Sequence, residues 1–167
     1  LASLKPLGLM PKRRTAILLN APALADIKDW PMVIDVDEQF YFKPDAGQIL
    51  LSPADETPSL PCDAQPEELD IAIAMDRFLA VVDLDIKSIN HSWAGLRTFA
   101  PDKTFVVGFD PIAKGFFWLA GQGGYGVQSS PGMSQLARHL ILQSALPTGY
   151  ERIKASVEAV SPTRFSS

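Results

Sequence analysis

The chain has 167 residues, of which 47% are hydrophobic and 20% are charged, and its formal net charge is −4. This length suits one domain of ordinary size, and the composition is typical of globular proteins, which excludes disordered, collagen-like and highly charged classes. No apolar run approaches the roughly 20 residues that a membrane-spanning helix needs. One cysteine, Cys62, and two histidines exclude an internal disulfide and a structural zinc set. We therefore expect no membrane span, no metal site and a cytoplasmic location.

The charge is unevenly distributed along the chain. Residues 1–25 carry four basic groups and no acid, residues 26–86 carry fifteen acids against three bases, and residues 87–167 carry eight bases and four acids. An acidic middle repels phosphate backbones, so we expect no nucleic-acid partner. The short basic run Lys12 to Arg14 is predicted to be a solvated entry to the first strand.

Four short strands are predicted in the first third of the chain, at residues 15–20, 32–35, 38–43 and 48–52. In the third of them Phe40 and Phe42 alternate with Tyr41 and Lys43. One face of that strand is therefore expected to pack, and the face that carries Tyr41 is expected to stay free. Residues 44–47, Pro-Asp-Ala-Gly, have the composition of a hairpin turn with Gly47 at positive φ.

A helix is predicted to follow an irregular, proline-rich connection over residues 53–66. Its first turn is Pro66-Glu67-Glu68-Leu69, in which proline is tolerated and the acids favour the positive end of the helix dipole. The apolar stripe that we expect it to bury is formed by Ile71, Met75, Phe78 and Val82.

Three more strands are predicted after this helix, at residues 87–99, 104–109 and 116–120. Strands, one helix and further strands in this order predict an α+β fold with an antiparallel or mixed sheet and one or two packed helices. A second long helix is expected to run to about Gln143, with Ser129 or Ser130 as its cap and Pro131 in its first turn. Its apolar side is predicted to comprise Met133, Leu136, Ala137, Leu140 and Ile141.

The glycines between the last predicted strand and this helix form a pattern with chemical meaning. Gly121, Gly123 and Gly126 satisfy G-x-G-x-x-G, which in this context can hold a pyrophosphate on backbone amides. A second strand with an acidic residue about 20 positions later is missing, however. The glycines are thus expected to approach a ligand closely without opening a nucleotide-binding domain, and a turn without any ligand is the alternative.

Several segments in order resemble FAD-dependent oxidoreductases of the D-amino-acid oxidase and glycine oxidase type. The segments are Tyr41-Phe42-Lys43-Pro44, Ser52-Pro53 with Glu56, Ser92-Trp93-Ala94-Gly95-Leu96-Arg97, Pro101-Asp102, Val106-Val107-Gly108 and Gly121-Gln122-Gly123-Gly124-Tyr125-Gly126. In that family an N-terminal strand and G-x-G-x-x-G loop hold the ADP part of FAD, and nothing before residue 121 resembles them. The resemblance therefore implies the C-terminal portion of a longer protein, an expectation to which a first residue other than methionine also points.

The resemblance also implies roles for individual residues. Arg97 would bind the substrate carboxylate, supported by the hydroxyl of Tyr41. The flavin ring would be contacted by Gly121, Gln122, Gly123, Gly124, Tyr125, Gly126 and Gln128, with amide donors near its electron-rich edge. The family often has histidine at the position of Gln122, so the hydrogen bonding there differs.

The implied reaction is hydride transfer from the α-carbon of a small amino acid, amine or 2-hydroxy acid to flavin N5, with no catalytic acid or base supplied by the protein. The implied organisation is a substrate-binding sheet domain over residues 1–112, a flavin-contacting strand, turn and helix over 113–145, and a tail over 146–167. The isolated chain is expected to be inactive without its FAD-binding half. A non-catalytic α+β binding or interaction module that does not hold FAD is the alternative function.

Overall fold

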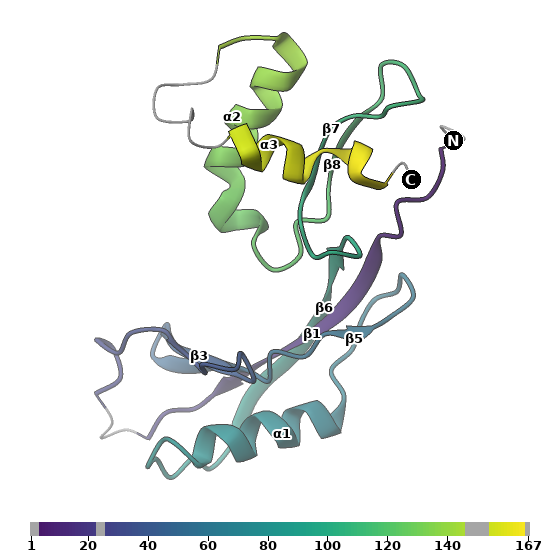
Figure 1. Ribbon diagram of the computed structural model, residues 1–167. Helices are drawn as coiled ribbons and strands as arrows, with labels where there is room; N and C mark the ends of the chain where they lie inside the picture. Colours follow the sequence, from purple (N-terminus) through teal and green to yellow (C-terminus); the bar gives the residue numbers. More distant parts are fainter. Residues whose placement is uncertain (1–3, 23–25, 146–153, 166–167) are drawn as a thin grey trace. The chain divides into compact units, whose positions relative to one another are not determined.

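The computed structural model describes residues 4–22, 26–145 and 154–165, and its fold is α+β as predicted. Its elements in chain order are β1 (Met10–Leu19), β2 (Val33–Ile34), β3 (Tyr41–Asp45), β4 (Gln48–Ser52), β5 (Thr57–Pro58), α1 (Glu68–Leu79), β6 (Ile89–Phe99), β7 (Val106–Phe109), β8 (Phe117–Ala120), α2 (Gly126–Leu142), α3 (Lys154–Val160) and the 3₁₀-helix η2 (Pro162–Phe165) (Figure 1). Two compact units are present. We call Lys12–Leu96 the sheet unit, and Leu1–Pro11 with Arg97–Ser167 the glycine-turn unit.

The sheet unit is built on a six-stranded sheet in the order β2-β3-β4-β1-β5, with β6 also paired to β1. The β3–β4 hairpin forms where it was predicted, but Pro44 and Asp45 belong to β3, so the turn comprises only Ala46 and Gly47, which have φ of +48° and +82°. Its register pairs Tyr41 with Ser52 and Asp45 with Gln48. The expected alternation is confirmed, since Phe40 and Phe42 are buried while Tyr41 and Lys43 are half-buried.

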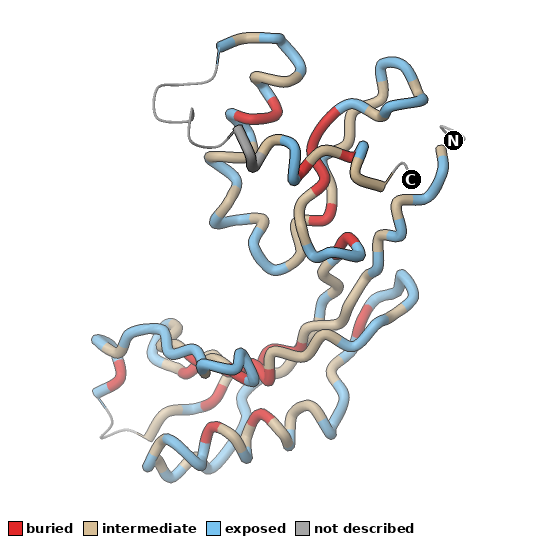
Figure 2. Tube along the Cα trace, viewed as in Figure 1, coloured by how far each residue is buried: buried red, intermediate tan, exposed pale blue. Residues whose placement is uncertain are grey.

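Helix α1 lies along one face of this sheet and closes the larger of the two hydrophobic clusters that the described residues form (Figures 1 and 2). Phe78 of α1 is fully buried and meets Phe42 edge to face, with 5.1 Å between ring centroids. The helix begins at Glu68, after Glu67 as its cap, so Pro66 precedes the helix instead of lying in its first turn. Val82, which was expected on the helical stripe, follows the end of the helix and still packs against the core.

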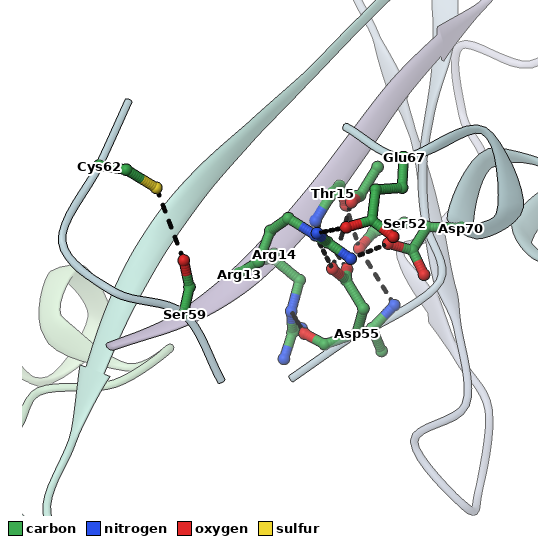
Figure 3. A network of polar contacts seen from close by, with 10 residues as sticks. Arg13, Arg14, Thr15, Ser52, Asp55, Ser59, Cys62, Glu67 and Asp70 are labelled. Carbon is green, nitrogen blue, oxygen red and sulfur yellow. Dashed lines mark hydrogen bonds and ion pairs between the residues drawn. The ribbon is translucent and has the colours of Figure 1, made fainter. Parts of the chain in front are cut away.

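The prediction that the basic run of β1 is solvated is wrong. Arg13 donates from Nη2 to Asp70 at 2.7 Å, also bonds Glu67, and lies 3.6 Å from Asp55 (Figure 3). Lys12 and Arg14 pair with Glu56. These acids neutralise the run and allow β1 to begin at Met10, five residues before the predicted start.

Asp55 also fixes the connection after β4. Its carboxylate accepts the backbone amide of Thr15 at 2.6 Å and the Thr15 hydroxyl at 3.1 Å, while the buried Ser52 hydroxyl donates to the carbonyl of Thr15 (Figure 3). Buried polar groups are stable only when they are hydrogen-bonded, and this network meets that condition for Thr15 and Ser52. These hydrogen bonds hold the start of the proline-rich connection against β1.

The glycine-turn unit contains the antiparallel hairpin of β7 and β8, with α2, α3 and η2 packed against β7. Its core cluster consists of the buried residues Val107, Leu136, Ala137 and Val160, and Met133 and Leu140 pack against it. Ile141, predicted on the same side of α2, is 48% exposed. Helix α3 and η2 lie within the predicted tail, whose first eight residues, 146–153, lie outside the described residues.

The predicted cap of the second long helix is wrong. Helix α2 begins at Gly126, so Ser129, Ser130 and Pro131 all lie inside it. Pro131 has no N–H for the carbonyl four residues earlier, that of Val127, and the Ser130 hydroxyl donates to this carbonyl at 2.8 Å instead. The serine therefore compensates the proline within the helix, which lets the helix start one turn earlier than expected.

No helix among the described residues combines the length and the apolarity that crossing a membrane requires. Within the same part of the chain, no three acidic, histidine or cysteine side chains gather in a way that could hold a metal ion. The predicted division at residues 112 and 145 differs from the two compact units, whose boundaries fall within β1 and β6, and it stays a prediction.

Candidate functional site

The glycine turn, residues Gly121 to Gly126, connects β8 directly to α2. Gly121 and Gly123 have φ of +73° and +51°, a left-handed conformation that favours glycine. The turn is closed by a hydrogen bond of 3.0 Å from the amide of Tyr125 to the carbonyl of Gln122. The sequence thus correctly placed a strand, a glycine-dependent turn and a helix in succession.

Close packing against the end of β6 explains why Gly123 has no side chain. A Cβ at Gly123 would lie 2.5 Å from the ring of Phe99, which real contacts do not allow. The amide of Gly123 donates to the carbonyl of Thr98 at 2.9 Å. The backbone of the turn is therefore held on the last residues of β6.

Arg97 lies at the same place. A Cβ at Gly124 would be 2.7 Å from Arg97 Nη1, so the guanidinium rests against the Gly124 backbone. Arg97 is half-buried and belongs to the glycine-turn unit together with the turn. The structure thereby brings together two of the predicted elements, the carboxylate-binding arginine and the flavin-contacting glycines.

Sequence reasoning assigned Phe99 no role beyond its strand. Side chains two positions apart on a strand point to the same face. Arg97 and Phe99 both contact the glycine turn, Arg97 at Gly124 and Phe99 at Gly123. The i, i+2 spacing from Arg97 was the signal that could have indicated Phe99 as part of the site.

The first turn of α2 offers amide donors next to the glycines. Tyr125 caps the helix without a side-chain hydrogen bond, and the first turn has no acidic residue. The backbone bond from Ser129 to the carbonyl of Tyr125 is 3.0 Å, so the amides of Gly126, Val127 and Gln128 precede it. Val127 and Gln128 are exposed. Such amides, at the positive end of a helix dipole, suit an anion or an electron-rich ring edge.

Tyr41 lies in the sheet unit, paired with Ser52 in β4 and Ile34 in β2. Its neighbour on the same face, Lys43, makes an ion pair of 2.7 Å with Asp45. Arg97 belongs to the other unit. The expected cooperation of Tyr41 with Arg97 at one carboxylate therefore stays a prediction.

Comparison with known proteins bears on both units. A family model described as FAD dependent oxidoreductase matches residues 1–140. The structure resembles a glycine oxidase from Geobacillus kaustophilus with a TM-score of 0.72 and 20% identity, and the match covers 95% of this chain and 40% of that protein. It also resembles an L-proline dehydrogenase from P. horikoshii with a TM-score of 0.75 and 22% identity, over 98% of this chain and 42% of that protein. A fructosamine oxidase from Aspergillus fumigatus is also similar, with a TM-score of 0.69 and 16% identity, over 93% of this chain and 40% of that protein. The chain spans about 40% of the length of these proteins.

Proposed function

The chain belongs to the DAO family of FAD-dependent oxidoreductases, and on this premise we propose that it forms the substrate site and the flavin-contacting turn of an enzyme that oxidises a small amino acid or amine. The observation that carries the proposal is the contact of the Arg97 guanidinium with the backbone of Gly124. It joins a group that binds carboxylates to a turn whose backbone can approach a cofactor. Arg97 and Gly124 belong to one compact unit, which supports the proposal.

The residues present are chemically suited to the isoalloxazine part of FAD. The amides of Gly123 and Tyr125 donate within the protein, to Thr98 and Gln122, and the other backbone amides of the turn, with Gln128, are the candidate neutral donors. The first turn of α2 carries no acid that would repel an electron-rich edge. Gly121 and Gly123 let this backbone pack closely against Ala100 and Phe99, where a side chain would crowd its neighbours. For the ADP part of FAD we propose a further portion of the protein, because these 167 residues span about 40% of the similar enzymes.

Arg97 is suited to the substrate because a guanidinium binds a carboxylate through two parallel hydrogen bonds. Such a bidentate pair fixes orientation as well as position, which brings the α-carbon to one defined place. The lack of a side chain at Gly124 lets the guanidinium lie directly on the turn. When bound, the flavin supplies the redox chemistry by accepting a hydride, and the protein supplies position and electrostatics.

The test uses the full-length protein with Arg97→Met. Glycine and L-proline are suitable probes, because similar enzymes are a glycine oxidase and an L-proline dehydrogenase. We expect KM for the amino acid that is oxidised to rise about 100-fold, since a hydrogen bond to a charged group contributes about 1.5–3 kcal/mol. With L-proline as the substrate, pyrrolidine is the matched control because it lacks only the carboxylate, and its KM should change little.

A second arginine of the same unit serves as the control variant. Arg138 is exposed on α2 and makes a hydrogen bond of 3.3 Å to Ser144, so Arg138→Met should leave KM unchanged. An unchanged KM in Arg97→Met contradicts the role of Arg97. A full-length protein that shows no flavin absorbance between about 350 and 500 nm and does not bind added FAD contradicts the enzyme proposal altogether, and would favour a non-catalytic binding module.

A further inference from the structure

The C-terminal segment packs tightly on β7 of the glycine-turn unit. Val160 is 7% exposed and belongs to the core cluster of this unit, and Pro162 is fully buried. Gly108 in β7 has φ of +146°, and a Cβ there would lie 2.9 Å from Pro162 Cδ. The strand therefore has space for the proline only because residue 108 is glycine. This complementarity fixes where the following residues lie.

Arg164, two residues later, binds the turn between β6 and β7. Its Nε donates to Asp102 Oδ2 at 2.7 Å and its Nη2 to Oδ1 at 3.2 Å, a two-point contact with the carboxylate. Nη2 also donates to the carbonyl of Thr104 at 2.9 Å, and Nη1 to that of Ser161 at 2.9 Å. The side chain of Arg164 is only 17% exposed. Such a partly buried, multiply bonded guanidinium holds its partners in one geometry.

The same β6–β7 turn forms the wall against which the glycine turn packs. A Cβ at Gly121 would lie 3.4 Å from the amide nitrogen of Ala100 and 3.6 Å from the carbonyl oxygen of Thr104. The β6–β7 turn itself is closed by a hydrogen bond of 2.9 Å from the amide of Lys103 to the carbonyl of Ala100. The carbonyl of Thr104 therefore accepts from Arg164 and also lies beside Gly121.

We propose that Arg164 is a positioning residue, which clamps the β6–β7 turn and thereby fixes the glycine turn before any ligand binds. The proposal rests on the proposed function for its catalytic meaning, since only a flavin makes the exact direction of the turn's amides important. Donors that are already oriented stabilise developing charge without a cost of reorganisation. The contacts of Arg164 with Asp102 and Thr104 supply this orientation from outside the site.

Hydrogen exchange of the full-length protein without added FAD tests the clamp directly. In Arg164→Met we expect amides of the two turns, at Lys103 and Gly123, to exchange about tenfold faster, as local opening becomes easier. Amides of the sheet unit should keep their rates. Arg138→Met is the matched control, because it removes the same charge from the same unit without touching either turn. Equal rates in Arg164→Met, or a uniform increase across both units, would overturn the proposal.

A flavin readout separates the clamp from mere structural support. The bound flavin of Arg164→Met should have a more negative reduction potential and bind about tenfold more weakly, and Arg164→Lys should restore part of both, because lysine keeps the charge but not the two-point contact. If Arg164→Met does not fold, Asp102→Asn removes the carboxylate charge more gently and carries the same expectation. A wild-type protein that binds no FAD contradicts the proposed function, and the exchange rates still test whether Arg164 positions the two turns. If folded Arg164→Met has the same flavin potential and the same FAD affinity as wild type, the positioning role of Arg164 is overturned.

Discussion

The two units differ in charge and in what holds them together. The sheet unit has fifteen acidic and seven basic residues, a net charge of −8, whereas the glycine-turn unit has four acidic and eight basic residues, a net charge of +4. Among the described residues, the main core cluster of the sheet unit has nine buried members and that of the glycine-turn unit has four. The sheet unit thus has the larger buried apolar cluster, whereas the glycine turn of the other unit is held by close backbone contacts. Basic surroundings also suit a unit that is proposed to receive a carboxylate.

The largest expected effect comes from opening the core of the sheet unit. Phe78→Ala removes a fully buried ring that contacts Phe42, and such truncations cost about 3–5 kcal/mol in the free energy of unfolding. The same change at Phe109 in the other unit, where the ring is 44% exposed, should cost about 1 kcal/mol. Urea unfolding followed by circular dichroism measures both. Equal losses would show that the units do not differ in their dependence on buried area.

Alanine substitutions of one glycine in each unit test how much close backbone packing stabilises the glycine-turn unit. Gly123→Ala places a Cβ 2.5 Å from Phe99 at a φ of +51°, so strain and overpacking together should cost about 3 kcal/mol. Gly47→Ala in the sheet unit has a φ of +82° and nothing within 4 Å, so only the backbone strain of about 1 kcal/mol remains. The difference in the free energy of unfolding isolates the close contact. A loss at Gly47 as large as that at Gly123 would contradict the packing argument.

One part of the sheet unit depends on ionic contacts, and Arg13→Met measures how much. Arg13 is 12% exposed, and its loss leaves Asp70 without its partner, at an expected cost of about 2 kcal/mol. Lys87→Met is the control, because Lys87 and its partner Asp85 are 79% and 73% exposed and such pairs contribute little. Thermal unfolding of both variants in low and high salt measures the difference. If Lys87→Met were as costly as Arg13→Met, the buried network would have no special role.

Local patterns in the sequence predicted the elements that depend on local chemistry. Strand β4 has the predicted bounds, 48–52, because a turn with Gly47 fixes its start. The start of β1 was predicted five residues late because the acids that neutralise Arg13, at positions 67 and 70, lie far away in sequence. A basic run has the composition of a solvated segment until its partners are known. Tertiary ion pairs thus decided an element boundary that local composition could not.

The site shows the same limit. The glycine turn could be predicted because its residues are consecutive, and the resemblance to a family indicated Arg97. That Arg97 lies on Gly124 and Phe99 under Gly123 depends on how two segments more than twenty residues apart meet. The start of α2 was missed because serine before proline is typical of a cap, while here Ser130 bonds the carbonyl of Val127 inside the helix. Neither the packing of Arg97 and Phe99 on the glycine turn nor the start of α2 can be predicted from the periodicity of apolar residues, because both depend on specific contacts between residues.

The smallest expected effect is a dependence of the glycine-turn unit on acid, through the pair of Asp102 and Arg164. The Arg164 hydrogen bonds lower the pKa of Asp102 below its ordinary value of 3.8, helped by the amide of Thr104 and opposed by desolvation. A carboxylate with a lowered pKa in the folded state binds fewer protons there than in the unfolded chain, so stability rises with pH in this range. The contribution is fully present above the ordinary pKa of the aspartate and is lost as the pH falls through the lowered value.

Asp102→Asn isolates this contribution, because asparagine has a similar shape and no charge to lose. Wild type should be more stable than the variant from neutral pH down to about 4, the ordinary range of an aspartate pKa, and the two should converge below it. Because Asp102 is 41% exposed, the difference should be modest and should shrink in salt. Thermal unfolding at closely spaced pH values measures it. A gap between wild type and variant that persists at low pH would mean that the stability of this turn comes from shape and not from the ion pair, and that the two units differ less in their electrostatics than their net charges indicate.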